Sequence, residues 1–160
     1  MVQMQQARWL DRLAELERPA ATEDLIELVV ALASRPRLWR PLVRHDPEQR
    51  WYERLLQTDA VEVWLIGWSA SQSTSVHDHG GAAGALIVIE GVLGEDEFSQ
   101  TLQLTHRSLH SAGASAGFAE THVHRVFNPT MQNATSIHAY SPPGREMREY
   151  MGRQVEIQGR

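Results

Sequence analysis

The sequence has no cysteine among its 160 residues, and this absence removes several classes of function. Without cysteine there is no disulfide framework, no thiolate zinc site and no cysteine nucleophile. Basic residues are outnumbered as well, because 15 Lys and Arg face 20 Asp and Glu and give a formal net charge of -5. That sign argues against a protein that binds nucleic-acid phosphates through a basic surface.

Long apolar segments are also missing. Apolar runs such as ALIVI at 85–89 are far too short to span a bilayer. Charges are scattered through the N-terminal residues, which lack the apolar core of a signal peptide. We therefore expect a cytoplasmic, monomeric protein that forms a single domain over 1–160, with no membrane and no nucleic acid among its partners.

Hydrophobic periodicity predicts that the first part of the chain is helical. Trp9, Leu13 and Leu16 recur at positions i, i+4 and i+7, which is the spacing of an amphipathic helix. A second helix is expected to begin at Thr22, whose side chain is a suitable N-cap. Prolines interrupt the residues that follow. The sequence thus predicts a helical N-terminal layer over 1–48.

From Trp51 onward the period changes to that of β-strands. Val61, Val63 and Leu65 alternate with less apolar residues, as in a strand with one buried face. Further strands are expected at 75–79, 84–90, 93–104, 106–110, 122–128, 135–141 and 153–157. Many short strands after a helical segment predict a mainly β protein with a small antiparallel barrel over 49–160.

Histidine is the abundant residue of this barrel. The chain has eight histidines, and His77 and His79 would share one face of a strand, roughly 7 Å apart along it. His122 and His124 form a second pair with the same alternation. Two imidazoles on one face can bind a single metal ion. The spacing alone leaves two interpretations open, a metal site or a set of surface and hydrogen-bonding histidines.

Two segments match the spacing of cupin motifs. The segment 77–91, HDHGGAAGALIVIEG, fits the first cupin motif, except that Gly84 occupies its glutamate position. The segment 124–128, HRVFN, fits the end of the second motif. Loss of the glutamate would leave a metal site of three neutral histidines.

Taken together, the motifs resemble those of the cysteine dioxygenase family of thiol dioxygenases, over roughly 50–145. The resemblance is carried by WYER at 51–54, SVHDH at 75–79, IEGVLGE at 89–95, HVHRVFN at 122–128 and SIHAYSPP at 136–143. It implies a cupin jelly-roll barrel that holds one mononuclear Fe(II) ion. The iron ligands of the family correspond to His77, His79 and His124, and imidazole suits ferrous iron.

The resemblance also implies roles for residues around the metal. Arg54 would hold the substrate carboxylate through its planar guanidinium, with Tyr52 beside it. The hydroxyl of Tyr140 would point at the iron site, and His138 would orient that hydroxyl by a hydrogen bond. These residues would make the site specific for a small acid.

Ser136 would extend the same hydrogen-bond network. Ser141 and Pro142 begin a Ser-Pro-Pro tripeptide whose first bond is cis in relatives, although the sequence itself leaves the isomer open. Animal members carry a cysteine that is cross-linked to the tyrosine equivalent to Tyr140. Here that position is Gly84, so the phenol stays free.

Other polar residues of the barrel are expected to have plainer roles. We place His122 either beside the metal site or at the surface. His106 and His110 are expected to be structural or exposed. Glu95 and Glu97 are expected to form a solvent-facing strand edge rather than an acid–base pair.

The resemblance implies oxidation of L-cysteine by O2 to cysteine sulfinate, with the thiolate and the amine bound to iron. A 3-mercaptopropionate dioxygenase is the first alternative, although such enzymes usually carry glutamine where this chain has Arg54. A cupin that binds zinc or nickel and is not an oxygenase is the second alternative. A cupin that only binds a ligand in its barrel is the third.

Overall fold

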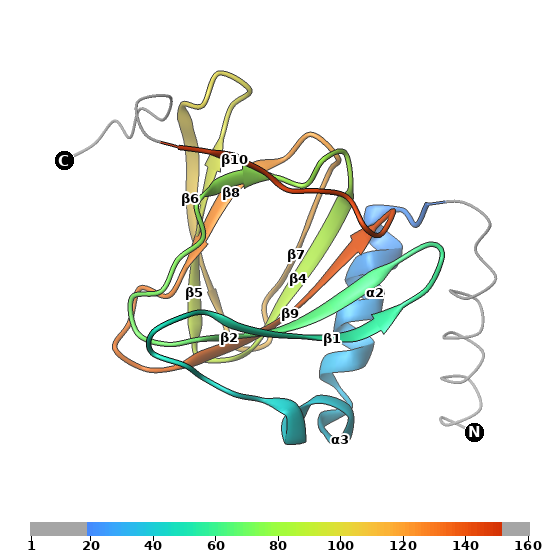
Figure 1. Cartoon of the computed structure of the whole chain (residues 1–160), viewed down its shortest axis with the longest axis vertical. Helices are drawn as coiled ribbons and strands as arrows, with labels where there is room; N and C mark the ends of the chain where they lie inside the picture. The colour runs from blue at the N-terminus through green and yellow to red at the C-terminus, as the bar shows by residue number, and fades with distance from the viewer. Residues whose placement is uncertain (1–18, 152–160) are drawn as a thin grey trace.

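Two five-stranded antiparallel sheets form a barrel in the computed structural model, which describes residues 19–151 (Figure 1). In spatial order, the first sheet contains β1 (Trp51–Gln57), β2 (Glu62–Trp68), β9 (Ala134–Ser141), β4 (Ala83–Glu90) and β7 (Ser115–Phe118). The second contains β10 (Arg148–Tyr150), β3 (Val76–Asp78), β8 (Val123–Phe127), β5 (Val92–Phe98) and β6 (Leu104–Ser111). The predicted mainly β barrel is confirmed.

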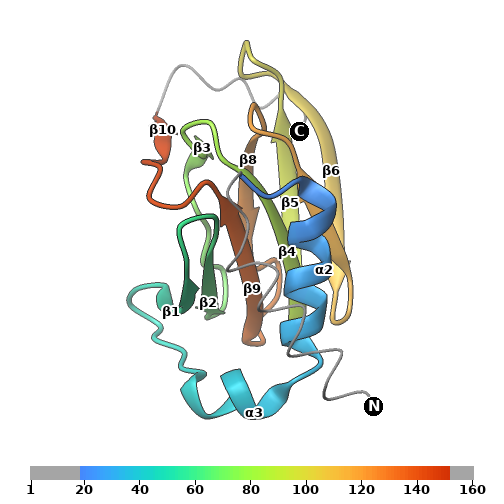
Figure 2. The same ribbon diagram turned by 90° about the vertical axis from the view of Figure 1, so that its right-hand side faces the viewer.

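The helices lie on the outer face of the first sheet, as Figure 2 shows. Helix α2 (Thr22–Ala33) packs on β4, β7 and β9, and the short α3 (Pro36–Trp39) and η1 (Arg40–Leu42) lead toward β1. The predicted N-cap is wrong by one residue. Ala21 is the N-cap, and its amide donates to the Asp24 carboxylate at 3.1 Å. Thr22 instead donates its hydroxyl to the Phe118 carbonyl oxygen at 3.4 Å.

Strict alternation gives the first sheet two different faces. Its outer face meets α2 through buried apolar side chains, among them Val63, Leu65 and Ile137. On β9, the residues on either side of Ile137 point the other way, into the barrel. Ser136 and His138 are therefore buried on the inner face. The same alternation that places apolar side chains against α2 thus places polar side chains inside the barrel.

The second sheet brings the two histidine motifs together. Strand β3 pairs with β8, and His77 lies directly opposite His124. Asp78, the last residue of β3, lies between His77 and His79 and faces the other side. There its carboxylate accepts hydrogen bonds from the Tyr150 hydroxyl at 2.6 Å and from the Arg148 Nε at 3.1 Å. This alternation directs both imidazoles of the pair inward and ties β10 to the outer face.

Most predicted strands are present, with three differences in the described residues. The segment predicted at 93–104 ends at Phe98, where a turn begins, and the short β7 and β10 were not predicted. The helix expected around Trp9, Leu13 and Leu16 and the strand expected at 153–157 lie outside the described residues. Among the helices of residues 19–151, none combines the length and the apolar character that crossing a membrane requires.

Candidate metal centre

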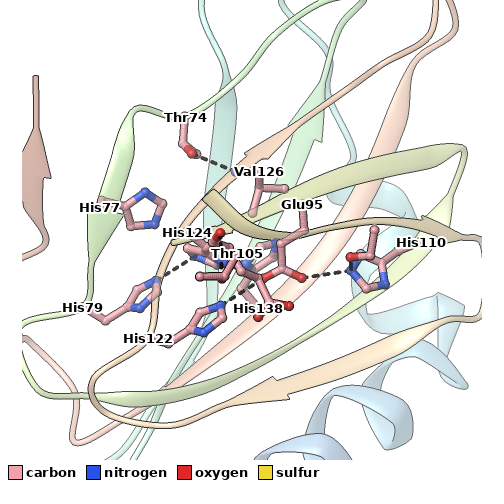
Figure 3. A network of polar contacts seen from close by, with 12 residues as sticks. Thr74, His77, His79, Glu95, Thr105, His110, His122, His124, Val126 and His138 are labelled. Carbon is pink, nitrogen blue, oxygen red and sulfur yellow. Dashed lines mark hydrogen bonds and ion pairs between the residues drawn. The ribbon is translucent and has the colours of Figure 1, made fainter. Parts of the chain in front are cut away.

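Three buried imidazoles converge inside the barrel, as Figure 3 shows. One ring nitrogen of each of His77, His79 and His124 lies within 4.8 Å of the others. The Nε2 atoms of His79 and His124 are 3.2 Å apart. The Nδ1 of His77 donates to the Ser75 carbonyl oxygen at 2.9 Å, so its Nε2 keeps a free lone pair. The structure thus brings together the three residues that were expected to bind a metal.

The interior keeps these imidazoles neutral. Burial, together with the neighbouring histidines, lowers the pKa of His77 to about 4 and the pKa of His79 to about 2. Burial also lowers the pKa of His124, although a hydrogen bond to Glu95 opposes the change. A neutral imidazole is the form that binds a metal ion. Three of them in one place fit a divalent transition metal such as ferrous iron.

The ring of His79 is held by stacking. Its Nδ1 is buried and has no hydrogen-bond partner among the described residues. Tyr140 stacks on the ring with centroids 5.1 Å apart, and Phe118 stacks on it at 4.7 Å. Phe118 also stacks on His122 at 5.0 Å. Phe118 was not predicted as a site residue, because the short strand that carries it shows no clear alternation.

A hydrogen-bond chain runs along the inner face of β9. The Trp68 indole N–H donates to the Ser136 hydroxyl at 2.9 Å, which lies 2.8 Å from the Nε2 of His138. The Nδ1 of His138 lies 3.2 Å from the Tyr140 hydroxyl. Burial lowers the pKa of His138 to about 3 and raises the pKa of Tyr140. Both groups therefore stay neutral at neutral pH.

The buried position of Ser136 sets the direction of this chain. Ser136 is fully buried, so its hydroxyl proton needs an acceptor, and the Nε2 of His138 is the one within reach. His138 then carries its proton on Nδ1 and donates it to the Tyr140 oxygen. The phenolic proton of Tyr140 is left to point into the adjoining space.

A cavity of about 620 Å³ opens beside one of the three imidazoles, that of His79, and Tyr140 is also part of its wall. Tyr52 lines it as predicted, but Arg54 does not. The Arg54 guanidinium lies 5.5 Å from the ring centre of Trp64 on an exposed stretch of β1. Arg54 therefore lies one residue away from the cavity, against Trp64, which is part of the cavity wall.

Arg50 lines the cavity in place of Arg54. Its guanidinium lies 5.1 Å from the ring centre of Trp68, and its NH1 donates to the Ser73 carbonyl oxygen at 3.3 Å. Its Nε has no partner among the described residues, and burial lowers the pKa of the group. Strand alternation indicates the face that carries Arg50, Tyr52 and Arg54. It does not indicate which of the arginines lies over the site.

Among the described residues, the Ser141 hydroxyl makes no hydrogen bond to the three imidazoles. The Ser141 hydroxyl donates to the Ala60 carbonyl oxygen at 2.6 Å and accepts from the Ala20 amide at 2.7 Å. Ser141 therefore fastens the N-terminal segment to the barrel. The Ser141–Pro142 peptide bond is cis.

The expectation of a solvent-facing edge is wrong for Glu95, which is only 3% exposed. Its carboxylate accepts hydrogen bonds from His110, His122 and His124. Burial raises the pKa of Glu95, but the three hydrogen bonds outweigh it and hold the pKa well below its usual value. Strand β5 is paired on both sides, by β6 and β8, and Glu95 and Asp96 of this acidic run are both buried.

Comparisons with solved structures support the fold. A Klebsiella pneumoniae protein with a double-stranded β-helix domain is 16% identical over 71% of this chain and 94% of that chain, with a TM-score of 0.60. A cupin superfamily protein from Desulfitobacterium hafniense is 12% identical over 65% of this chain and 87% of that chain, with a TM-score of 0.54. A Thermus thermophilus protein is 20% identical over 64% and 92%, with a TM-score of 0.57. These likenesses show the cupin fold.

The family itself is identified by a sequence model. The model described as cysteine dioxygenase type I matches residues 5–153, which is nearly the whole chain. The match spans the three converging histidines, the hydrogen-bond chain of β9 and the cavity beside them. The chain therefore belongs to the cysteine dioxygenase type I family.

Proposed function

We propose that this protein is an Fe(II)-dependent thiol dioxygenase that converts L-cysteine and O2 to cysteine sulfinate. The observation that carries the proposal is the set of three neutral imidazoles that converge in the barrel. One of them, His79, lies in the wall of a cavity that two arginines and two tyrosines also line, among them Arg50 and Tyr140. The reaction R–SH + O2 → R–SO2H is balanced without a reductant. Sulfur loses four electrons, O2 gains four, and both oxygen atoms enter the product.

His77, His79 and His124 would hold the iron. A ferrous ion bound there would stabilise the substrate thiolate and activate O2. Because the three ligands are neutral imidazoles, they leave the dipositive charge of the ion uncompensated. The barrel also buries the imidazoles, which limits the access of bulk water to the reacting sulfur.

Arg50 is the residue that we propose to bind the substrate carboxylate. Its planar guanidinium can bind a carboxylate through two parallel N–H donors. Among the described residues, only its NH1 donates a hydrogen bond, so the rest of the guanidinium stays available. Tyr140 would add a neutral O–H donor. In the hydrogen-bond chain that begins at Trp68, His138 donates its N–H to the Tyr140 oxygen, which leaves the phenolic proton free to be donated to a substrate.

A 3-mercaptopropionate dioxygenase is the second candidate, and the position of Arg54 favours considering it. The sequence argument for cysteine depended on Arg54, which does not line the cavity. Arg50 would serve either carboxylate. The two substrates differ in the amino group, which only cysteine carries. Because the carboxylate is common to both, a comparison of their turnover is needed to choose between them.

The experiment is oxygen uptake by the full chain after anaerobic loading with Fe(II). We expect one sulfinate to form for each O2 consumed, and faster turnover of L-cysteine than of 3-mercaptopropionate at equal concentration. Faster turnover of 3-mercaptopropionate would make 3-mercaptopropionate, rather than L-cysteine, the preferred substrate. No uptake with either thiol would refute the proposal, and tight binding of zinc or nickel instead of iron would favour a cupin of another class. We also propose a cytoplasmic monomer, which size-exclusion chromatography and cell fractionation test.

A further inference from the structure

A buried carboxylate lies directly behind one of the three candidate metal ligands (Figure 3). The Oε1 of Glu95 is 2.7 Å from the Nδ1 of His124 and 3.1 Å from the Nε2 of His122. Its Oε2 is 2.9 Å from the Nε2 of His110. An ionised carboxylate only accepts, so each of these imidazoles donates its N–H to it. Three donors therefore share one carboxylate.

The pairing of the strands explains why these side chains meet. Strand β5 carries Glu95 and lies between β6, which carries His110, and β8, which carries His124. His122 comes just before β8. The side chains of His110 and His122 are 14% and 17% exposed, whereas that of Glu95 is 4% exposed. The cluster thus runs from the edge of the barrel to the centre of the candidate metal site.

The three candidate ligands are supported in different ways. The Nδ1 of His77 donates to a neutral backbone carbonyl, and the Nδ1 of His79 has no partner among residues 19–151. His124 alone of the three donates to a carboxylate. A carboxylate behind a ligating histidine fixes the ring tautomer and makes the other nitrogen a stronger donor to the metal.

We propose that Glu95 is a positioning residue, which holds His124 with its proton on Nδ1 and its Nε2 toward the metal, and that His110 and His122 anchor Glu95. This inference rests on the proposed metal site but not on the thiol reaction. His110 and His122, which the sequence left without a clear role, fasten the carboxylate from two sides. Without them, His124 would be the only imidazole holding Glu95.

A second metal ion is the competing interpretation, because Glu95, His122 and His124 also lie close enough together to hold one. The 2.7 Å between Glu95 and the Nδ1 of His124 is the length of a charge-assisted hydrogen bond. An ion bound to the Nδ1 of His124 would also need that imidazole to lose its only N–H, since its Nε2 faces the first site. The hydrogen bond is the simpler account of the distance.

The test is metal affinity in the full chain carrying Glu95→Gln, measured anaerobically by competition with a chelator for Fe(II) and for Co(II). We expect affinity to fall roughly tenfold to hundredfold, as for other carboxylates behind ligating histidines. Glu97→Gln is the matched control. It removes the same charge from the same face of β5, but the Glu97 side chain makes no hydrogen bond to an imidazole in residues 19–151. Its affinity should stay within about threefold of the parent, because only a longer-range charge effect is lost.

Equal affinities for the two variants would overturn the proposal, and so would two ions bound per chain. A variant that fails to fold is recognised by the thermal melt of the metal-free protein. In that case the parent protein still decides, since long-range ¹H–¹⁵N NMR locates the proton of His124. A proton on Nδ1 supports the inference, and a proton on Nε2 refutes it. No thiol enters these measurements, so failure of the dioxygenase proposal would be seen separately, as absent oxygen uptake by a protein whose affinities follow the prediction.

Discussion

Replacing Arg50 by alanine should weaken the binding of a thiol that carries a carboxylate. Hydrogen bonds to charged groups contribute about 1.5–3 kcal/mol, and truncating one member of a partly desolvated ion pair costs about 2–5 kcal/mol. Taking about 2–3 kcal/mol for the half-buried Arg50, kcat/KM for L-cysteine should fall roughly 30- to 150-fold, since about 1.4 kcal/mol corresponds to a factor of ten. We expect most of this loss in KM.

Arg54→Ala is a close control for this variant. Both guanidinium groups lie over a tryptophan of β2, Arg50 at 5.1 Å from Trp68 and Arg54 at 5.5 Å from Trp64. Each alanine variant therefore loses a similar cation–π contact, worth about 0.5–1 kcal/mol. Similar losses of thermal stability are expected, whereas kcat/KM should change only for Arg50.

The assay is oxygen consumption by the iron-loaded variants over a range of substrate concentrations. Cysteamine, which is cysteine without its carboxylate, separates carboxylate binding from general damage to the site. Its turnover in the Arg50 variant should match its turnover in the parent protein. A larger loss in the Arg54 variant, or an equal loss for cysteine and cysteamine in the Arg50 variant, would refute the assignment.

Three further variants and conditions test the site. His124→Ala should abolish iron binding and oxygen uptake, whereas His122→Ala should lose much less, because only His124 faces the other two candidate ligands. Tyr140→Phe should keep its iron but lower kcat roughly tenfold to hundredfold, as when one positioned donor is removed. In urea unfolding without metal, the free energy of unfolding should keep its full value above pH 6.5 and fall toward pH 4. The reason is that His77 has a pKa of about 4 in the folded protein and a higher pKa in the unfolded chain. His77 alone contributes about 3 kcal/mol to this fall.

Each of these predictions has a clear contrary result. Retained iron and normal turnover in His124→Ala would show that the third ligand is misassigned, and equal losses in the His122 and His124 variants would leave no distinction between them. Unchanged kcat in Tyr140→Phe would exclude the phenol from the reaction. Constant stability between pH 7 and pH 4 would mean that His77 has the same pKa in the folded and the unfolded chain.

The grouping of the three candidate ligands could be predicted in part, because the direction of each side chain depends on local rules. Alternation places both histidines of an H-x-H pair on one face, and pairing of neighbouring strands then brings His77 opposite His124. The outer face follows from the same rule, since Val63 and Leu65 are buried against α2. The face on which each of these side chains lies is therefore encoded at short range, whereas strand pairing brings the two histidine pairs together.

The residues that were missed depend on long-range placement. Alternation could not distinguish Arg50 from Arg54, because the distance of each from the imidazoles depends on how β1 crosses the barrel. Glu95 resembled a surface residue because an acidic run indicates solvent unless the strand is known to be central. Strand β7 was missed because it is short and contains Gly117, where a Cβ would lie 2.5 Å from the Thr22 Cγ2 of α2.

Gly84 has a consequence for any attempt to rebuild the thioether of the animal relatives. A Cβ at this position would lie 2.2 Å from ring atoms of Phe118, so the missing cysteine is excluded by shape as well as by composition. Phe118 is also the ring against which His79 is stacked. Making room for a cysteine by shrinking Phe118 would thus loosen an imidazole whose Nδ1 has no hydrogen-bond partner among the described residues. A cysteine side chain at position 84 and the Phe118 ring would compete for the same small volume. In this chain the volume is filled by Phe118, which stacks on His79.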